Sequence, residues 1–249
     1  MDSVYRLVLW NIDLTLVDVA RVSREACADA FRAVTGRPLV ALPQTAGRTD
    51  SESFFEALAL NDPGGGPGGH ADAAAQDLLA HYTRELAAAF GRRAHLLVTR
   101  GRALPGAQDA VAAVAGLPGM IQSVLTGTIR PNAMTKLRAF GMDQFFDFEI
   151  GGYGSEIYPK GAQLLHSRGR AAEKYRADIG AAATVYIADS VRDVEAAGIA
   201  GAHCVAVASG RSTAGELRDA GADLVLDDLA DISAVVRVVD RLTSAVSAG

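Results

Sequence analysis

A short apolar segment near the start of the chain leads directly into polar residues that could do chemistry. Residues 4–10 are mostly apolar, and Asn11, Asp13 and Thr15 follow at alternate positions. A carboxylate at the end of a buried strand is costly unless a cation or a hydrogen-bond donor compensates it. The spacing therefore predicts either a cation site that includes Asp13, or a helix start that Asp13 or Thr15 caps.

Later segments place further polar residues close to the ends of predicted strands. Thr126 and Gly127 follow one apolar strand, although a turn alone would explain that pair. Asp189 follows another strand and Asp193 comes four residues later, so both carboxylates can face one point. Lys160 opens a predicted helix and, by itself, would be an ordinary solvated lysine. Together these hydroxyl, ammonium and carboxylate groups could hold a phosphate group and a divalent cation.

The segments that must position these residues alternate between strand and helix. The apolar, β-branched segments typical of buried strands are 4–10, 121–125, 184–188, 203–208 and 224–226. Helical patterns cover 106–116, 131–140, 160–176, 191–200, 213–220 and 231–246. This alternation predicts an α/β fold with a doubly wound, Rossmann-like parallel sheet. Ligands bind beyond the carboxyl ends of the strands in such sheets.

Residues 19–98 interrupt the alternation. Helical stretches lie near 20–35, 51–60 and 71–91, with no convincing strand among them. The glycine-rich run 64–69 predicts a flexible connection rather than a phosphate loop, because the lysine that such a loop needs does not follow it. We expect residues 19–98 to form an inserted all-helical cap domain, and residues 1–18 with 99–249 to form the core domain.

The order of these segments resembles that of the haloacid dehalogenase-like phosphohydrolases over essentially the whole chain. An insert between the first and second motifs is where that family places a helical cap of the first type. The likeness is greatest to small-molecule phosphatases of the phosphoglycolate phosphatase and β-phosphoglucomutase type. The four motifs lie at Asn11 to Thr15, at Thr126, at Lys160, and at Asp189 with Asp193.

The resemblance implies a role for each residue in hydrolysis of a phosphate monoester. The first acidic position of the family attacks phosphorus, and the second, here Asp13, protonates the leaving oxygen and then activates water. Thr126 and Gly127 would bind the phosphoryl group. Lys160 would offset the negative charge. The implied partner is a small phosphorylated or anionic metabolite.

The resemblance also implies a Mg²⁺ site and a cap residue that contacts the substrate. Asp189 would bind Mg²⁺ with the main-chain carbonyl of Asp13 and the side chain at position 11, and Asp193 would support the ion directly or through water. Arg48, in the segment 47–50, could reach an anionic substrate from the cap. In the alternative, Thr49 or Asp50 caps a helix and Arg48 lies on the surface.

Asn11 stands where the family has its nucleophilic aspartate. An amide is uncharged and its oxygen is a poor nucleophile, so an aspartyl-phosphate should not form. Loss of a catalytic nucleophile costs on the order of 10⁶ in turnover. We therefore expect phosphatase activity to be impaired or abolished.

Two origins for Asn11 stay open. One is a deliberate substitution that traps a substrate, and the other is natural divergence. Leu14, Thr128 and Ala188 also depart from the family's common residues, which favours divergence. A diverged chain could be a pseudophosphatase that binds a phosphometabolite, or an enzyme of another type that uses Asp13 as acid or base.

Composition excludes several other classes of protein. The chain has 249 residues and a formal net charge of −5, with acidic and basic residues mixed, so no nucleic-acid surface is expected. No apolar run is long enough to span a bilayer. Cys27 and Cys204 are too few and too far apart for a disulfide framework. We expect a cytoplasmic protein, and the sequence does not specify an oligomeric state.

Overall fold

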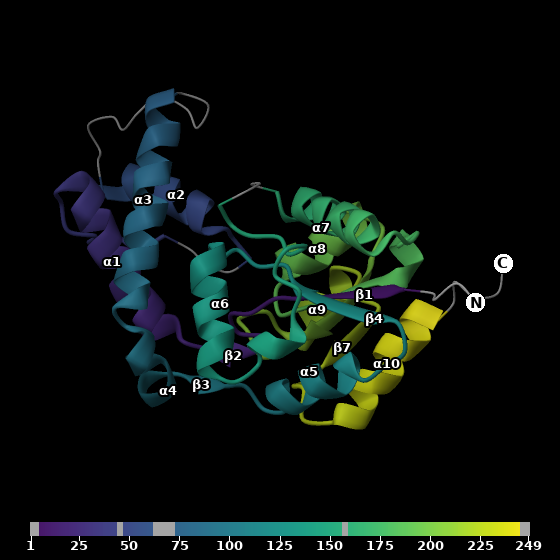
Figure 1. Cartoon of the computed structure of the whole chain (residues 1–249). Helices are drawn as coiled ribbons and strands as arrows, with labels where there is room; N and C mark the ends of the chain where they lie inside the picture. Colours follow the sequence, from purple (N-terminus) through teal and green to yellow (C-terminus); the bar gives the residue numbers. More distant parts are fainter. Residues whose placement is uncertain (1–4, 44–46, 62–72, 156–158, 245–249) are drawn as a thin grey trace.

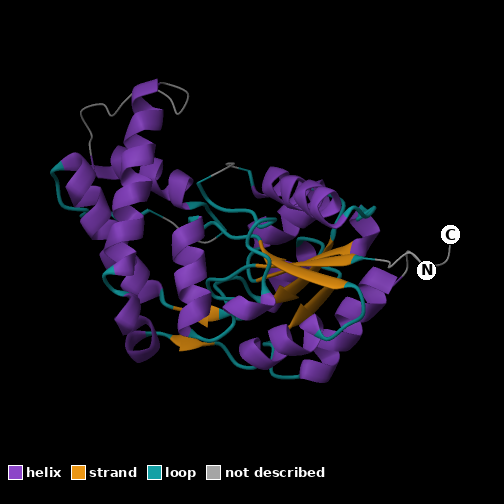
Figure 2. Ribbon diagram, viewed as in Figure 1, coloured by secondary structure: helices purple, strands orange, loops and turns teal. Residues whose placement is uncertain are grey.

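The computed structural model describes residues 5–43, 47–61, 73–155 and 159–244. The predicted glycine-rich connection at 64–69 lies outside the described residues. Helices cover both sides of a central group of strands, and further helices pack together apart from the sheet (Figures 1 and 2). This arrangement is the predicted α/β core with a helical cap.

The central sheet has five parallel strands in the order β4-β1-β5-β6-β7. Because β1 lies inside the sheet and later strands add on both of its sides, the sheet is doubly wound, as predicted. The strands agree with the predicted segments to within two residues. They are β1 Arg6–Trp10, β4 Met120–Val124, β5 Thr184–Ala188, β6 His203–Val207 and β7 Leu224–Leu226.

Alternate residues of β1 pack into two separate hydrophobic cores. Val8 and Trp10 belong to one core and Leu7 and Leu9 to the other, and all four side chains are fully buried. This alternation follows from the period of two in a strand. The first core includes residues of α5 Ala107–Ala115, α6 Arg130–Ala139 and α10 Ile232–Ser244. The second includes residues of α7 Lys160–Tyr175, α8 Val191–Ile199 and α9 Ala214–Asp219.

Three long helices form the cap: α1 Ala20–Thr35, α2 Asp50–Asn61 and α3 Ala73–Gly91. Figure 1 shows them packed together on one side of α6. Aromatic rings join them, since Phe54 stacks on Tyr82 with ring centroids 4.1 Å apart and meets Phe31 edge to face. Short helices at Ala94–Leu96 and α4 Leu97–Arg100 lead back toward the core.

A two-stranded antiparallel ribbon lies where the chain leaves the core and returns to it. It pairs β2 Val17–Asp18 with β3 Arg102–Ala103, and Asp18 is the partner of Arg102. The sequence did not predict this ribbon, because two residues are too few for a periodic pattern. Short 3-10 helices at Asp143–Phe145 and Ala181–Ala183 complete the fold.

Among the residues that the structure describes, no helix is both long enough and apolar enough to cross a membrane.

Candidate active site

The register of the sheet brings three predicted site residues to one edge. Trp10 is paired with both Val124 of β4 and Ile187 of β5, so these strands end side by side. Asn11 follows Trp10 directly, and its N–H donates to the carbonyl of Ile187 at 2.8 Å. Thr126 lies two residues beyond Val124, and Asp189 lies two residues beyond Ile187. Their side chains therefore meet Asn11 at the carboxyl edge of the sheet.

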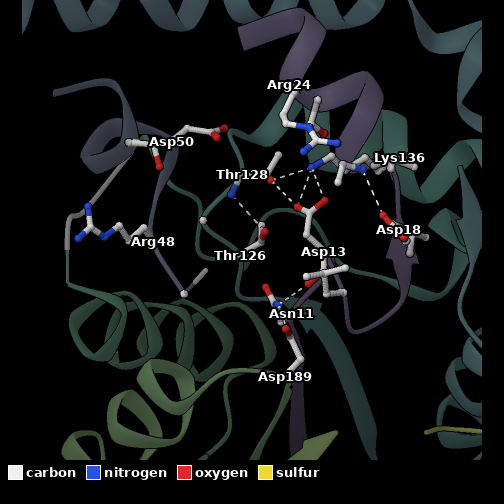
Figure 3. Close-up of a pocket in the computed structure, with 18 of the residues that line it drawn as sticks. Asn11, Asp13, Asp18, Arg24, Arg48, Asp50, Thr126, Thr128, Lys136 and Asp189 are labelled. Carbon is white, nitrogen blue, oxygen red and sulfur yellow. Dashed lines mark hydrogen bonds and ion pairs between the residues drawn. The ribbon is translucent and has the colours of Figure 1, made fainter. Parts of the chain in front are cut away.

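A pocket of about 180 Å³ opens at this edge between the core and the cap (Figure 3). The core supplies its floor, and residues of α1, of α2 and of the segment before α2 supply its far wall. The predicted site residues that line it are Asn11, Asp13, Arg48, Thr126, Gly127, Lys160 and Asp189. Asp193 does not contribute to this lining.

The Asn11 side chain points its amide nitrogen at oxygen atoms. Nδ2 lies 2.8 Å from Oδ1 of Asp189, 3.0 Å from the main-chain oxygen of Asp13 and 3.3 Å from Oγ1 of Thr15. The hydroxyl of Thr15 also donates to Oδ1 of Asp189, at 3.0 Å. A carbonyl and a carboxylate only accept hydrogen bonds, so they fix the amide in this orientation. Asn11 thus acts as a hydrogen-bond donor to these oxygen atoms.

Asp189 is the acidic group on the pocket floor. Burial, together with the nearby negative charge of Asp193, raises the pKa of Asp189 to about 7. Its Oδ2 faces the backbone of Gly210, where an added Cβ would lie only 1.9 Å from that oxygen. A glycine is therefore needed at position 210 to leave room for the carboxylate.

The oxygen atoms around Asn11 fit a hard cation such as Mg²⁺. The Asp13 carbonyl and the Asp189 carboxylate face a common point, because both lie within 3.0 Å of the same amide nitrogen. Rotation of that amide would bring a third oxygen to the same point. Mg²⁺ is commonly held by one or two carboxylates and completes its shell with water and substrate phosphate. Within the described residues, no cluster of three or more His, Cys, Asp or Glu side chains could hold a metal, so main-chain and amide oxygens would have to contribute.

Lys160 and Asp193 form a buried ion pair beside the pocket. Lys160 Nζ lies 2.5 Å from Oδ1 of Asp193, which also accepts from the Tyr186 hydroxyl at 2.9 Å. The hydroxyl of Ser190 donates to Oδ2 at 2.5 Å. Both oxygens of Asp193 are therefore occupied by protein donors, and the pair fixes Lys160 in place. The structure does not bring Asp193 to the pocket, and its expected role near a metal stays a prediction.

Lys136 is a site residue that the sequence analysis missed. Its side chain is buried, and Nζ lies 2.8 and 2.7 Å from the two carboxylate oxygens of Asp13 and 2.9 Å from Oγ1 of Thr128. The Thr128 hydroxyl donates to Asp13 at 2.9 Å. Figure 3 shows the Asp13 side chain directed toward Lys136 and Thr128, away from Asp189. Lys136 lies between buried Ala133 and Leu137 on α6, and that position on an apolar helix face could have identified it.

Arg48 and Thr49 lie next to each other on the cap side of the site, and each has partners within the cap. Arg48 makes an ion pair with Glu56, and Figure 3 shows it directed away from Asp13. Thr49 and Glu52 form reciprocal hydrogen bonds at the start of α2, since the Thr49 N–H and hydroxyl donate to the Glu52 carboxylate and the Glu52 N–H donates back to the hydroxyl. This capping role for Thr49 was the alternative interpretation of the segment. Contact between Arg48 and a substrate stays a prediction.

Asp50 joins the cap to the core. Its carboxylate accepts the N–H of Ile129 at 2.9 Å, and its own N–H donates to the carbonyl of Gly127 at 2.7 Å. Burial raises the pKa of Asp50 to about 6, although the Lys136 ammonium partly opposes that rise. A Cβ on Gly127 would lie 2.0 Å from the Arg48 carbonyl, so only glycine permits this close approach.

Comparisons with known proteins agree with this geometry. The family model described as haloacid dehalogenase-like hydrolase matches residues 8–198, and a related hydrolase-like model matches residues 166–232. No curated protein matches the chain.

Solved structures share the fold at low sequence identity. A predicted phosphatase from Clostridium acetobutylicum is 17% identical, with a TM-score of 0.65 and coverage of 96% of this chain and 100% of that one. A predicted phosphoglycolate phosphatase from Haemophilus somnus is 20% identical, with a TM-score of 0.63 and coverage of 93% and 97%. An aspartate-to-asparagine mutant of CbbY from Rhodobacter sphaeroides, in complex with xylulose 1,5-bisphosphate, is 21% identical, with a TM-score of 0.63 and coverage of 91% and 96%. The family match spans most of the sequence, and the chain belongs to the haloacid dehalogenase-like hydrolases.

Proposed function

We propose that the chain is a phosphatase-type member of this family that binds a small phosphate monoester, and that Asn11 impairs or abolishes its hydrolysis. The observation that carries the proposal is the convergence of Asn11, Thr126, Gly127 and Lys160 on one pocket. A hydroxyl, main-chain groups and an ammonium are the groups that bind a phosphoryl oxygen. The CbbY mutant, which holds a bisphosphate, is consistent with a phosphorylated ligand.

The phosphoryl group would lie against the floor of the pocket. Thr126 would donate its hydroxyl proton to one phosphoryl oxygen, and the Lys160 ammonium would offset the negative charge. Asp193 has no direct part in this contact. Its ion pair with Lys160 keeps the ammonium in one orientation, so that little side-chain entropy is lost when the ligand binds.

Asp13 would exchange protons with the substrate or with water. Lys136 and Thr128 donate hydrogen bonds to its carboxylate and hold it in one orientation. A carboxylate oriented in this way could accept a proton from an attacking water molecule. Its side chain is 38% exposed, so a ligand or a water molecule in the pocket can reach it.

Asp189, the main-chain carbonyl of Asp13 and the amide oxygen of a rotated Asn11 would hold Mg²⁺. The ion would supply positive charge that stabilises negative charge on the phosphoryl oxygens. Arg48 would contribute to substrate binding only after its ion pair with Glu56 opens.

Restoration of the acidic side chain tests the proposal. The variant Asn11→Asp should release phosphate from p-nitrophenyl phosphate in the presence of Mg²⁺, at a rate at least about 10³ times that of the unchanged protein. The double variant Asn11→Asp with Thr126→Ala is the matched control, and it should lose most of the gain because the phosphoryl group loses a hydrogen-bond donor. Similar rates for the unchanged protein and the Asn11→Asp variant would contradict the role assigned to this position.

Binding without turnover is the second candidate function. The Asn11 amide, hydrogen-bonded to Asp189 and Asp13, favours it, because the group has no negatively charged oxygen for attack on phosphorus. The Lys136 ion pair is also consistent with an enzyme of another type that uses Asp13 as a base. A pseudophosphatase should bind phosphate esters and release no phosphate even as the Asn11→Asp variant.

A further inference from the structure

The charges around the pocket floor leave one negative group without a cationic partner. Lys160 neutralises Asp193, and Lys136 neutralises Asp13. Within the described part of the chain, Asp189 accepts hydrogen bonds only from the uncharged groups of Asn11 and Thr15. An aspartate at position 11 would add a second negative charge beside Asp189. With Asn11 the floor has only half of the charge needed to balance a divalent cation.

Mg²⁺ alone meets two obstacles at this floor. The Asn11 amide already satisfies the Asp13 carbonyl and the Asp189 carboxylate, and its nitrogen must turn away before its oxygen can face a cation. The ion would then be held by one carboxylate and two neutral oxygens. A hard cation gives up its hydration shell reluctantly, so a set of ligands this weak should bind it poorly.

A phosphate group alone meets a different obstacle. It would approach Thr126 and Lys160 while the Asp189 carboxylate lies on the same floor. Asp189 is buried, so water screens this repulsion poorly. A cation between the two negative groups would remove the repulsion, and a phosphate oxygen would supply the anionic ligand that Asn11 lacks.

We propose that this chain takes up Mg²⁺ only together with a phosphate-bearing ligand, because Asn11 leaves the cation one anionic ligand short. The inference rests on the proposed function, and it adds that the cation and the phosphate-bearing ligand depend on each other for binding. Linkage requires that each component strengthen the binding of the other by the same factor.

Isothermal titration calorimetry at pH 8 tests the inference with Mg²⁺ alone, inorganic phosphate alone, and each in the presence of the other. We expect no saturable Mg²⁺ binding below about 10 mM without phosphate. With saturating Mg²⁺, phosphate affinity should rise at least about tenfold. The readout is binding, so it does not depend on turnover.

Two variants make the test specific. Asn11→Asp should bind Mg²⁺ without phosphate, because it restores the second carboxylate. Asp189→Asn should not bind Mg²⁺ even when phosphate is present, which would place the binding signal at this floor. Circular dichroism spectra and melting temperatures show whether each variant is folded. If a variant does not fold, the titrations of the unchanged protein alone test whether Mg²⁺ binding depends on phosphate.

The outcomes separate the two proposals. If the unchanged protein binds Mg²⁺ alone within about threefold of Asn11→Asp, the dependence on phosphate is wrong. If phosphate binds with the same affinity with and without Mg²⁺, the further inference fails and the proposed function stands. If phosphate binds under neither condition, the proposed function itself is wrong.

Discussion

Two buried lysine–aspartate pairs flank the same pocket, and they differ in what they leave free. In the Lys160–Asp193 pair the side chains are 7% and 1% exposed, and protein donors occupy both carboxylate oxygens. In the Lys136–Asp13 pair the lysine is 3% exposed but the aspartate is 38% exposed and lines the pocket. In the first pair the carboxylate is closed to solvent and only Lys160 borders the pocket, whereas the second pair presents its carboxylate to a ligand.

This difference suits the first carboxylate to a structural role and the second to direct contact with a ligand. A closed pair can fix the geometry of the group that it holds, but its carboxylate has no free oxygen for a ligand. An open pair holds a carboxylate in position while a substrate can still reach it. Buried ion pairs contribute little net stability, whereas removal of one partner leaves a buried charge that is costly. Substitutions of single partners should therefore distinguish the pairs.

Loss of the closed pair should have the largest effect. Lys160→Met leaves the fully buried Asp193 charge without its cation, so the free energy of unfolding should fall by about 3–5 kcal/mol. Urea unfolding followed by circular dichroism measures this change. A loss below about 1 kcal/mol would mean that Tyr186 and Ser190 satisfy Asp193 without the lysine.

Loss of the open pair should cost less stability. Lys136→Met exposes a charge that water can already reach, so we expect a loss of about 2 kcal/mol in urea unfolding. The pocket becomes more negative, so phosphate affinity in the presence of Mg²⁺ should fall about tenfold. Lys136→Arg keeps the charge and should recover part of that affinity. Equal phosphate affinity in all three proteins would show that Lys136 is only structural.

Asp50 also lines this pocket, and no lysine among the described residues donates a hydrogen bond to it. Its protonation should make stability depend on pH in a defined direction. Its pKa is about 6 in the folded protein, against 3.8 for an ordinary aspartate. The folded state therefore binds the proton more tightly, and its stabilising contribution is complete below pH 3.8 and is lost as pH rises to about 6. Because the side chain is only partly buried, we expect a change of about 1–2 kcal/mol.

Comparison with Asp50→Asn isolates this contribution from the other carboxylates. The variant should be the less pH-sensitive of the two proteins between pH 4.5 and about 6.5, in urea midpoints measured at constant ionic strength. If the unchanged protein instead gained stability relative to Asp50→Asn as the pH rises, the folded state would favour the charged form of Asp50.

An exposed pair should show the smallest effect. Lys174 contacts Asp147 at 2.8 Å and Glu149 at 2.5 Å, but its side chain is 40% exposed. Lys174→Met should lower the free energy of unfolding by less than about 1 kcal/mol, and salt should reduce the difference. Urea unfolding, as for Lys160→Met, gives the ratio of the two losses in stability. A ratio near one would show that burial of an ion pair does not determine the cost of removing its lysine.

Much of the fold could be predicted because its signals are local. The strand segments show apolar runs, and the helix from Ala20 to Thr35 was predicted with the bounds that the structure has. Leu14 is an exception at one residue. It lies in the left-handed region with φ of 60°, a conformation that favours glycine and that the residue type alone does not predict.

The ion pairs could not be predicted from local patterns. Lys136 contacts Asp13 across 123 positions of sequence, and Lys160 contacts Asp193 across 33. Only the order of the strands and the packing of α6 and α7 in the fold bring these residues together. The direction of Arg48 was also beyond the sequence, because it depends on Glu56 two helical turns away.

The β2–β3 ribbon has a consequence for how the cap region can vary. Since Asp18 and Arg102 are neighbours across the ribbon, the insert begins and ends at nearly one point. Its length and contents can therefore change without any change in the separation of the two anchor strands. A core whose strand ends carry the proposed phosphate-binding groups can thus be combined with different caps, and selectivity can diverge while the sheet beneath it stays the same.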